Sequence, residues 1–151
     1  MSNKMSTVWV DADSCPVKEE IQSMTEKEPV DVRFIASYDH YTPFHGEAWT
    51  FVEKGQDAVD LYILNRASQA DIAITQDLSL ASLLLERGVY VLTPRGKLIK
   101  SFEIESIMHS KYIRMKEKRQ GNYGKGPSAV TKADRELFKR ELLALLKRSM
   151  S

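Results

Sequence analysis

Short β-rich segments alternate with segments of helical character up to about residue 110. The expected strands cover residues 7–10, 30–36, 49–52, 72–75 and 89–92, and the expected helices cover residues 17–26, 57–68, 78–87 and 102–110. Such alternation is typical of a domain in which right-handed crossovers join the strands of one sheet. The sequence therefore predicts an α/β fold with a mostly parallel central sheet.

The end of the chain has a different character. Thr131 and Asp134 stand at capping-box spacing and open an expected final helix, whose apolar stripe comprises Phe138, Leu142, Leu145 and Leu146. We expect this stripe to dock on the domain, and a homodimer contact is the alternative. Residues 119–128 are the most linker-like stretch. We expect one domain over residues 1–151, with an α/β body at 7–110 and a basic segment plus C-terminal helix at 111–149.

Charge is distributed unevenly along the chain. Residues 1–100 contain 10 Lys and Arg against 15 Asp and Glu, whereas residues 101–151 contain 12 against 6. An acidic body followed by a basic segment is consistent with an anionic partner such as RNA, and a solvated basic helix is the alternative.

Composition excludes several classes of protein. Cys15 is the single cysteine, so no internal disulfide can form. One cysteine and three histidines argue against a structural zinc site. No apolar run approaches the ~20 residues of a membrane span, and the N-terminus lacks the features of a signal peptide. We therefore expect a cytoplasmic protein without membrane contact.

Acidic residues follow two of the expected strands. Asp11 comes directly after residues 7–10, Asp13 follows it, and Asp77 lies just beyond residues 72–75. Ligands of open parallel sheets bind beyond the carboxyl ends of the strands. Asp60 lies among apolar residues of an expected helix, and an inward-facing acid needs a partner such as a cation.

These four aspartates are our candidate catalytic residues. Asp11, Asp60 and Asp77 are the candidate ligands of Mg²⁺ or Mn²⁺, which prefer oxygen donors. The alternative is structural, because aspartate is a common helix cap and Asp13, Asp57 and Asp77 each stand near an expected helix start.

Basic residues supply candidate contacts to a phosphate backbone. They lie in the basic segment and in the turn after residues 89–92: Arg95, Lys97, Lys111, Arg114, Lys118 and Arg119. Tyr112 lies among them and could stack on an unpaired base. Ser14 and Thr75, beside the acidic positions, are weaker candidate substrate contacts.

Three segments resemble the YaiI/YqxD family of small bacterial proteins: WVDADSCPV, DAVDLYILNRASQADIAITQDLSLASLLLERGVYVLTPRGK and GKGPSAVTKADRELFKREL. The resemblance runs from about residue 7 to residue 146. This family is in turn similar to PIN-like domains, many of which are metal-dependent ribonucleases. The resemblance implies a three-layer PIN-like domain in which Asp11, Asp60 and Asp77, the last with Thr75 in a T-x-D motif, hold the metal. Asp13 matches the D-A-D motif of the YaiI/YqxD family itself.

The leading functional hypothesis is a Mg²⁺- or Mn²⁺-dependent phosphodiesterase acting on RNA. One alternative is an RNA-binding module with a vestigial acidic pocket, which is not an enzyme. Another is a small-molecule phosphatase with an aspartyl nucleophile, which suits an Asp-x-Asp after the first strand. However, Cys15 stands where enzymes of the haloacid-dehalogenase type have Thr or Val.

Overall fold

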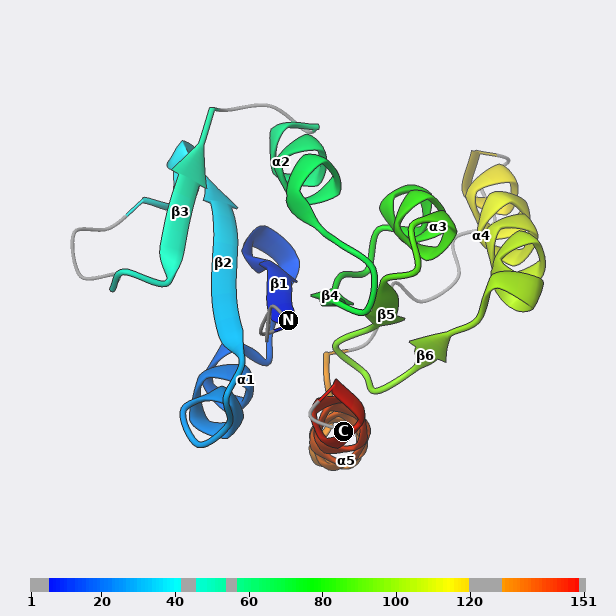
Figure 1. The fold of residues 1–151 in the computed structure, drawn as a ribbon. Coiled ribbons are helices and arrows are strands. Elements are labelled where there is room, and N and C mark those ends of the chain that lie inside the picture. Colours follow the sequence, from blue (N-terminus) through cyan, green and yellow to red (C-terminus); the bar gives the residue numbers. More distant parts are fainter. Residues whose placement is uncertain (1–5, 42–45, 54–56, 120–128, 150–151) are drawn as a thin grey trace.

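The computed structural model describes residues 6–41, 46–53, 57–119 and 129–149. Within these ranges the chain forms a six-stranded sheet of order β3-β2-β1-β4-β5-β6 (Figure 1). The strands are β1 (Thr7–Asp11), β2 (Asp31–Ser37), β3 (Trp49–Val52), β4 (Ile72–Ile74), β5 (Tyr90–Leu92) and β6 (Leu98–Ile99). All neighbouring strands are parallel except β5 and β6. The predicted α/β fold with a mostly parallel sheet is confirmed.

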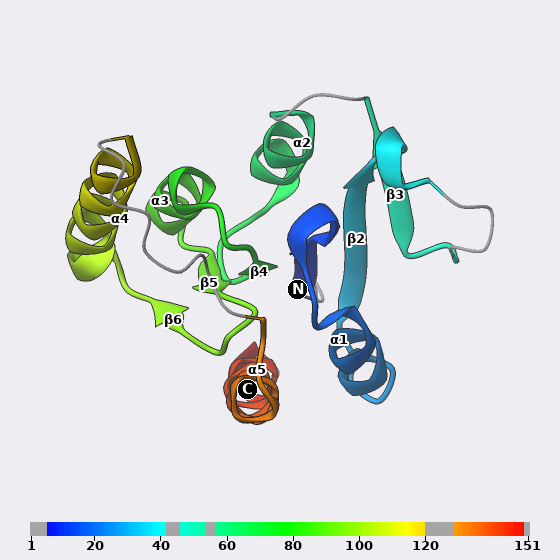
Figure 2. The same ribbon diagram turned by 180° about the vertical axis from the view of Figure 1, so that it is seen from behind.

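Helices cover both faces of the sheet. They are α1 (Lys18–Thr25), α2 (Ala58–Arg66), α3 (Leu78–Glu86), α4 (Ile104–Arg119) and α5 (Lys132–Ser149), with short 3₁₀ turns η1 (Ala12–Ser14), η2 (Tyr38–His40) and η3 (Ser101–Glu103). Figures 1 and 2 show α1 and α5 on one face, and α2, α3 and α4 on the other. None of the helices in the described ranges is both long and apolar enough to span a membrane.

The final helix docks on the sheet through its apolar stripe, as predicted. Phe138, Leu142 and Leu146 are fully buried, and Leu145 is nearly so. The N-terminus of α5 has the predicted reciprocal cap, because Asp134 accepts from the Thr131 N–H and the Thr131 hydroxyl accepts from the Asp134 N–H, both at 3.0 Å. Local capping and tertiary packing therefore agree in placing α5.

Two features differ from the sequence-based expectation. The strand pair β5–β6 was not predicted, since the two residues of β6 carry too little pattern to identify a strand. The helix expected at residues 102–110 continues to Arg119 as α4, so the basic segment begins inside a helix. Lys, Arg, Met and Glu, which are good helix formers, dominate this extension. Most of the predicted linker, residues 120–128, lies outside the described residues.

The order of the strands creates a switch point between β1 and β4. From β1 the chain proceeds to β2 and β3 on one side and then returns to β4 on the other side. At such a point the connections leave the carboxyl ends of the two central strands in opposite directions, which opens a crevice where ligands bind in open α/β sheets. The residues that follow β1 and β4 therefore border the position most suited to a site.

Candidate functional site

A cavity of about 530 Å³ lies at the carboxyl ends of β1 and β4. Its lining residues are Asp11, Asp13, Ser14, Val59, Asp60, Gln76, Asp77, Ser79 and Lys111. The structure thus brings the four candidate catalytic aspartates together, although they come from β1, η1, α2 and the loop before α3.

Asp11 is the deepest of these acids. It is the last residue of β1, and only 8% of its surface is exposed. Its Oδ2 accepts a hydrogen bond from the Thr75 hydroxyl at 3.0 Å, and that hydroxyl accepts the N–H of Asp77 at 3.0 Å. Burial raises the pKa of Asp11, and the hydrogen bond from Thr75 opposes this effect. Thr75 is itself buried, so it positions two acids rather than facing a ligand.

Asp77 has a structural role as well as a place in the cavity. Its Oδ1 accepts the N–H of Leu80 at 3.0 Å, which caps the N-terminus of α3. The capping interpretation is therefore confirmed for Asp77, and the same side chain also lines the cavity. Asp57, by contrast, precedes α2 without a side-chain cap bond.

Asp60, on the first turn of α2, has the most perturbed acid–base equilibrium. The pKa of Asp60 is raised to about 7, and partial burial is the largest cause. A hydrogen bond with Asp77 and the negative charges of Asp77, Asp11 and Asp57 raise it further. Near neutral pH Asp60 is therefore partly protonated, and it forms a hydrogen bond with Asp77. Two acids forced together in this way are typical of functional sites.

Asp13 does not cap a helix. Both of its carboxylate oxygens lie near the backbone N–H of Ser37, at 3.0 and 3.2 Å, so Asp13 holds the end of β2 beside η1. Helix α1 begins only at Lys18, after Val17, which forms no side-chain cap. The helix-cap interpretation of Asp13 was therefore wrong, because the chain makes a 3₁₀ turn before α1 starts.

Loop residues complete the cavity wall. The side chain of Gln76 donates to the carbonyl of Ser14 at 3.0 Å and so ties the loop after β4 to η1. Ser14 is exposed at the cavity, as a substrate contact requires. Sequence reasoning missed Val59, Gln76 and Ser79, although each lies one or two residues from a candidate aspartate. That proximity was the available signal.

Four of the basic candidates belong to α4, and two belong to the turn between β5 and β6. Lys111 of α4 lines the cavity, and Arg114 is exposed one turn further along the helix. Lys118 and Arg119 belong to the last turn of α4, and their side chains lie outside the described part of the structure.

Arg95 and Lys97 are not brought to the cavity. Arg95 pairs with Asp134 at 2.7 Å, and Lys97 pairs with Glu103 at 3.1 Å. The reason is the turn between β5 and β6, which packs against α5. A Cβ on Gly96 in this turn would stand 2.7 Å from the backbone nitrogen of Phe138.

Cys15 is not placed as a nucleophile. It is 3% exposed, and burial raises the pKa of its thiol to about 11. A nucleophilic cysteine requires a thiolate near neutral pH, which this environment disfavours. The chemistry of the cavity therefore rests on its carboxylates and Lys111.

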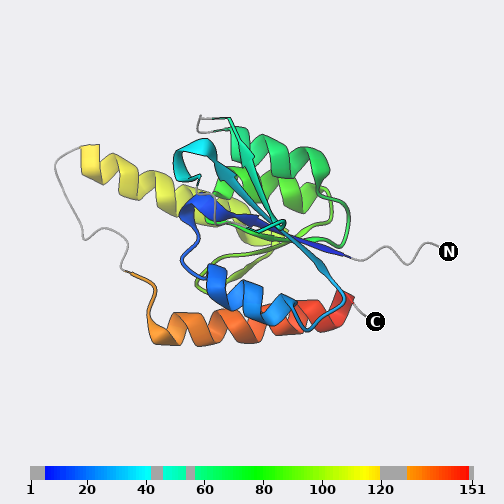
Figure 3. The same ribbon diagram turned by 90° about the vertical axis from the view of Figure 1, so that its left-hand side faces the viewer.

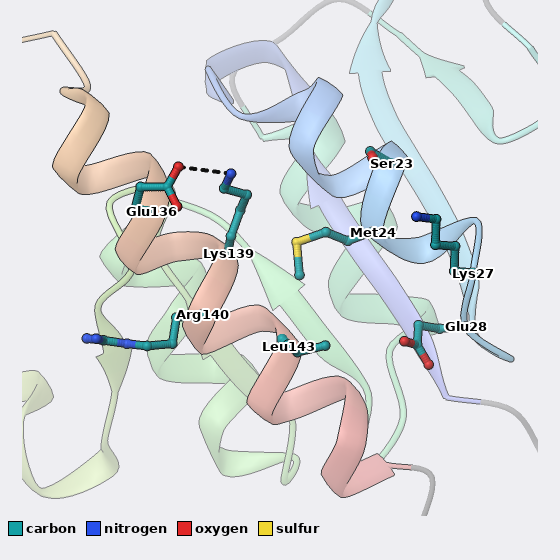
Figure 4. A pocket seen from close by; sticks show the side chains of 8 residues that line it. All are labelled: Ser23, Met24, Lys27, Glu28, Glu136, Lys139, Arg140 and Leu143. Atoms are coloured by element: carbon teal, nitrogen blue, oxygen red, sulfur yellow. Dashed lines mark ion pairs between the residues drawn. The ribbon is translucent and has the colours of Figure 1, made fainter.

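A second cavity, of about 500 Å³, lies between α1 and α5 (Figure 4). Met24 and Leu143 point toward one another across it, and charged residues of both signs stand at its rim. Glu136 there is paired with Lys139 at 3.0 Å. None of the candidate site residues lines this groove.

The acidic cavity offers oxygen donors, which are the ligands that Mg²⁺ and Mn²⁺ prefer. As the side chains stand, however, no three His, Cys, Asp or Glu residues in the described ranges are grouped closely enough to hold a metal ion. Asp60 is instead hydrogen-bonded to Asp77. The prediction of a bound Mg²⁺ or Mn²⁺ therefore stays a prediction.

Comparison with known proteins identifies relatives over nearly the whole chain. A family model described as "Uncharacterized BCR, YaiI/YqxD family" matches residues 9–148. A UPF0178 protein of Bacillus cytotoxicus is 44% identical, over 94% of this chain and 93% of that protein. A UPF0178 protein of Listeria innocua is 42% identical, over 95% of this chain and 99% of that protein. No solved structure matches the chain.

Proposed function

The chain belongs to the YaiI/YqxD family, and we propose that it is a Mg²⁺- or Mn²⁺-dependent phosphodiesterase acting on RNA. The observation that carries the proposal is the convergence of Asp11, Asp13, Asp60 and Asp77 with Lys111 on one cavity at the switch point of the sheet. Carboxylates that lie close together repel one another, and a cluster of them at the carboxyl ends of the central strands suggests a cationic ligand. The arrangement of acids on β1, α2 and the loop after β4 also supports a PIN-like relationship.

Asp11, Asp60 and Asp77 would hold the cation. When bound, a divalent cation polarises a phosphoryl oxygen and lowers the pKa of a bound water. Asp60 becomes available as an anionic oxygen ligand when it loses its proton, so cation affinity is coupled to pH. Thr75 keeps Asp11 and Asp77 in a fixed relation through its two hydrogen bonds.

Other residues would act on the substrate. Lys111 places a positive charge on the wall of a cavity that is otherwise acidic, which favours a phosphate group at that position. Arg114 extends this charge along α4, and Tyr112, 60% exposed, lies beside it. Asp13 keeps η1 against the end of β2 and so shapes the cavity.

The test is cleavage of labelled single-stranded RNA in Mn²⁺ by the wild type and by Asp11→Asn. We expect the substitution to abolish cleavage while circular dichroism shows an intact fold. Glu86→Gln is the matched control, because Glu86 is an exposed acid of α3 outside the cavity. If Asp11→Asn cleaves at the wild-type rate, the proposed mechanism is wrong.

A further inference from the structure

A group of aromatic side chains stands at the carboxyl end of β2. Tyr38 and Tyr41 are 54% and 56% exposed, and their ring centroids lie 6.2 Å apart. Phe51 of β3 contacts both, with centroid distances of 6.2 Å to Tyr38 and 5.0 Å to Tyr41. We call Tyr38, Tyr41 and Phe51 the tyrosine platform. Its exposed part consists of two large rings with polar tips.

The tyrosine platform is anchored in the core. Phe51 stacks on Trp49 at 6.0 Å with an interplanar angle of 19°, and Trp49 stacks on Phe34 at 4.9 Å with an angle of 12°. Phe34 is 1% exposed. The parallel pairing of β2 with β3 sets this row of rings, because it places Phe34 beside Trp49. A ring array held in this way loses little entropy when a flat ligand packs on it.

The tyrosine platform is connected to the acidic cavity along the backbone, although its own side chains do not line the cavity. Tyr38 directly follows Ser37, whose N–H donates to the cavity residue Asp13 at 3.0 Å. Figure 3 shows η2, which contains Tyr38, at the same end of the sheet as η1, and α4 projecting beyond that end. Helix α4 supplies Lys111 to the cavity wall. Aromatic rings, acids and a basic side chain therefore share one end of the molecule.

We propose that the tyrosine platform stacks an unpaired base of a nucleic-acid strand whose phosphate backbone contacts Lys111. This inference rests on the proposed phosphodiesterase function and specifies its substrate as single-stranded. Every base has a face that can stack on an open ring, whereas the bases of a duplex are already stacked on each other. The acidic cavity repels a phosphate backbone, so stacking on Tyr38 and Tyr41 and the charge of Lys111 supply the binding.

The test measures binding without catalysis. Fluorescein-labelled octauridine is titrated with protein in EDTA, and anisotropy is compared with an abasic strand of equal length and with a duplex. Tyr38→Ala and Tyr41→Ala should each weaken octauridine binding about tenfold, as expected for the loss of one stacking partner. Tyr38→Phe keeps a ring and should bind nearly as well as the wild type. Phe102→Ala is the matched control, because Phe102 is 88% exposed in η3, away from the platform.

Three results would overturn the inference. The first is equal affinity of the wild type for octauridine and the abasic strand. The second is an octauridine affinity that neither alanine substitution changes, although both variants unfold cooperatively. The third is a wild-type dimer in sedimentation that Tyr38→Ala converts to monomers, because the platform would then be a protein interface. Octauridine binding that depends on Tyr38, without any cleavage in Mn²⁺, would support the platform and contradict only the proposed phosphodiesterase.

Discussion

Replacing Asp60 with Asn is expected to stabilise the protein above neutral pH. Burial and the neighbouring acids raise the pKa of Asp60 from the ordinary 3.8 to about 7, so the folded state binds a proton more tightly than the unfolded state. Deprotonation therefore costs more in the folded protein. The free energy of unfolding should fall as pH rises between about 4 and 7, and asparagine removes this loss.

The magnitude follows from the pKa difference. A rise from 3.8 to about 7 sets an upper bound of about 4 kcal/mol on the destabilisation at pH 8. Asp60 is only half-buried, so solvent screens much of this repulsion. We therefore expect Asp60→Asn to raise the free energy of unfolding by about 1–2 kcal/mol at pH 8 and by much less at pH 4.5.

Urea unfolding followed by circular dichroism at both pH values measures this difference in the absence of divalent cations. Glu86→Gln is the control, since Glu86 is an exposed acid of α3 that lies outside the cavity. Its effect should stay within about 0.5 kcal/mol. The reasoning is refuted if Asp60→Asn lowers the urea midpoint at pH 8, or if its effect is equal at the two pH values.

Three further substitutions test the surrounding structure by thermal or urea unfolding. Thr75→Val should lower the free energy of unfolding by about 1–3 kcal/mol, because the Asp11 carboxylate and the Asp77 N–H lose the hydroxyl as their hydrogen-bond partner. Thr75→Ser should recover most of that loss. Gly96→Ala should lower the free energy of unfolding by at least about 2 kcal/mol, because the φ of Gly96 is +91° and a Cβ there would lie 2.7 Å from α5. Gly46→Ala is its control and should be nearly neutral, because a Cβ at Gly46 has nothing within 4 Å. Leu142→Ala should cost about 2–5 kcal/mol, whereas Leu143→Ala, at a 38% exposed position, should cost under about 1 kcal/mol. Equal losses of stability in the two glycine variants, or in the two leucine variants, would contradict the packing argument for that pair. No recovery of stability in Thr75→Ser would contradict the hydrogen-bond argument for Thr75.

The positions of Asp11 and Asp77 could be predicted because they depend on local sequence alone. Each residue closely follows a β-rich segment, and parallel strands bring their carboxyl ends to one edge. Asp60 was also identified, from its place among apolar residues of a helix. Its raised pKa could not be predicted, because it depends on how α2 packs beside the start of α3.

The basic residues show where local reasoning fails. Arg95 and Lys97 follow a strand, as site residues do, but β6 turns this segment toward α5 and η3, where both side chains are paired. The tyrosine platform could not be predicted from the sequence either. Phe51 reaches Tyr38 only through the pairing of β2 with β3, which a single sequence does not specify.

Calorimetric titration of Mn²⁺ into the wild type and into Asp11→Asn tests the central claim most directly. We predict binding to the wild type, and none to Asp11→Asn in a variant that remains folded. The wild-type affinity should rise with pH up to about 7, by at most about tenfold per pH unit, because the cation competes with the proton on Asp60. Absence of binding to the wild type at pH 8, or equal binding by the two proteins, would contradict a cation site in this cavity.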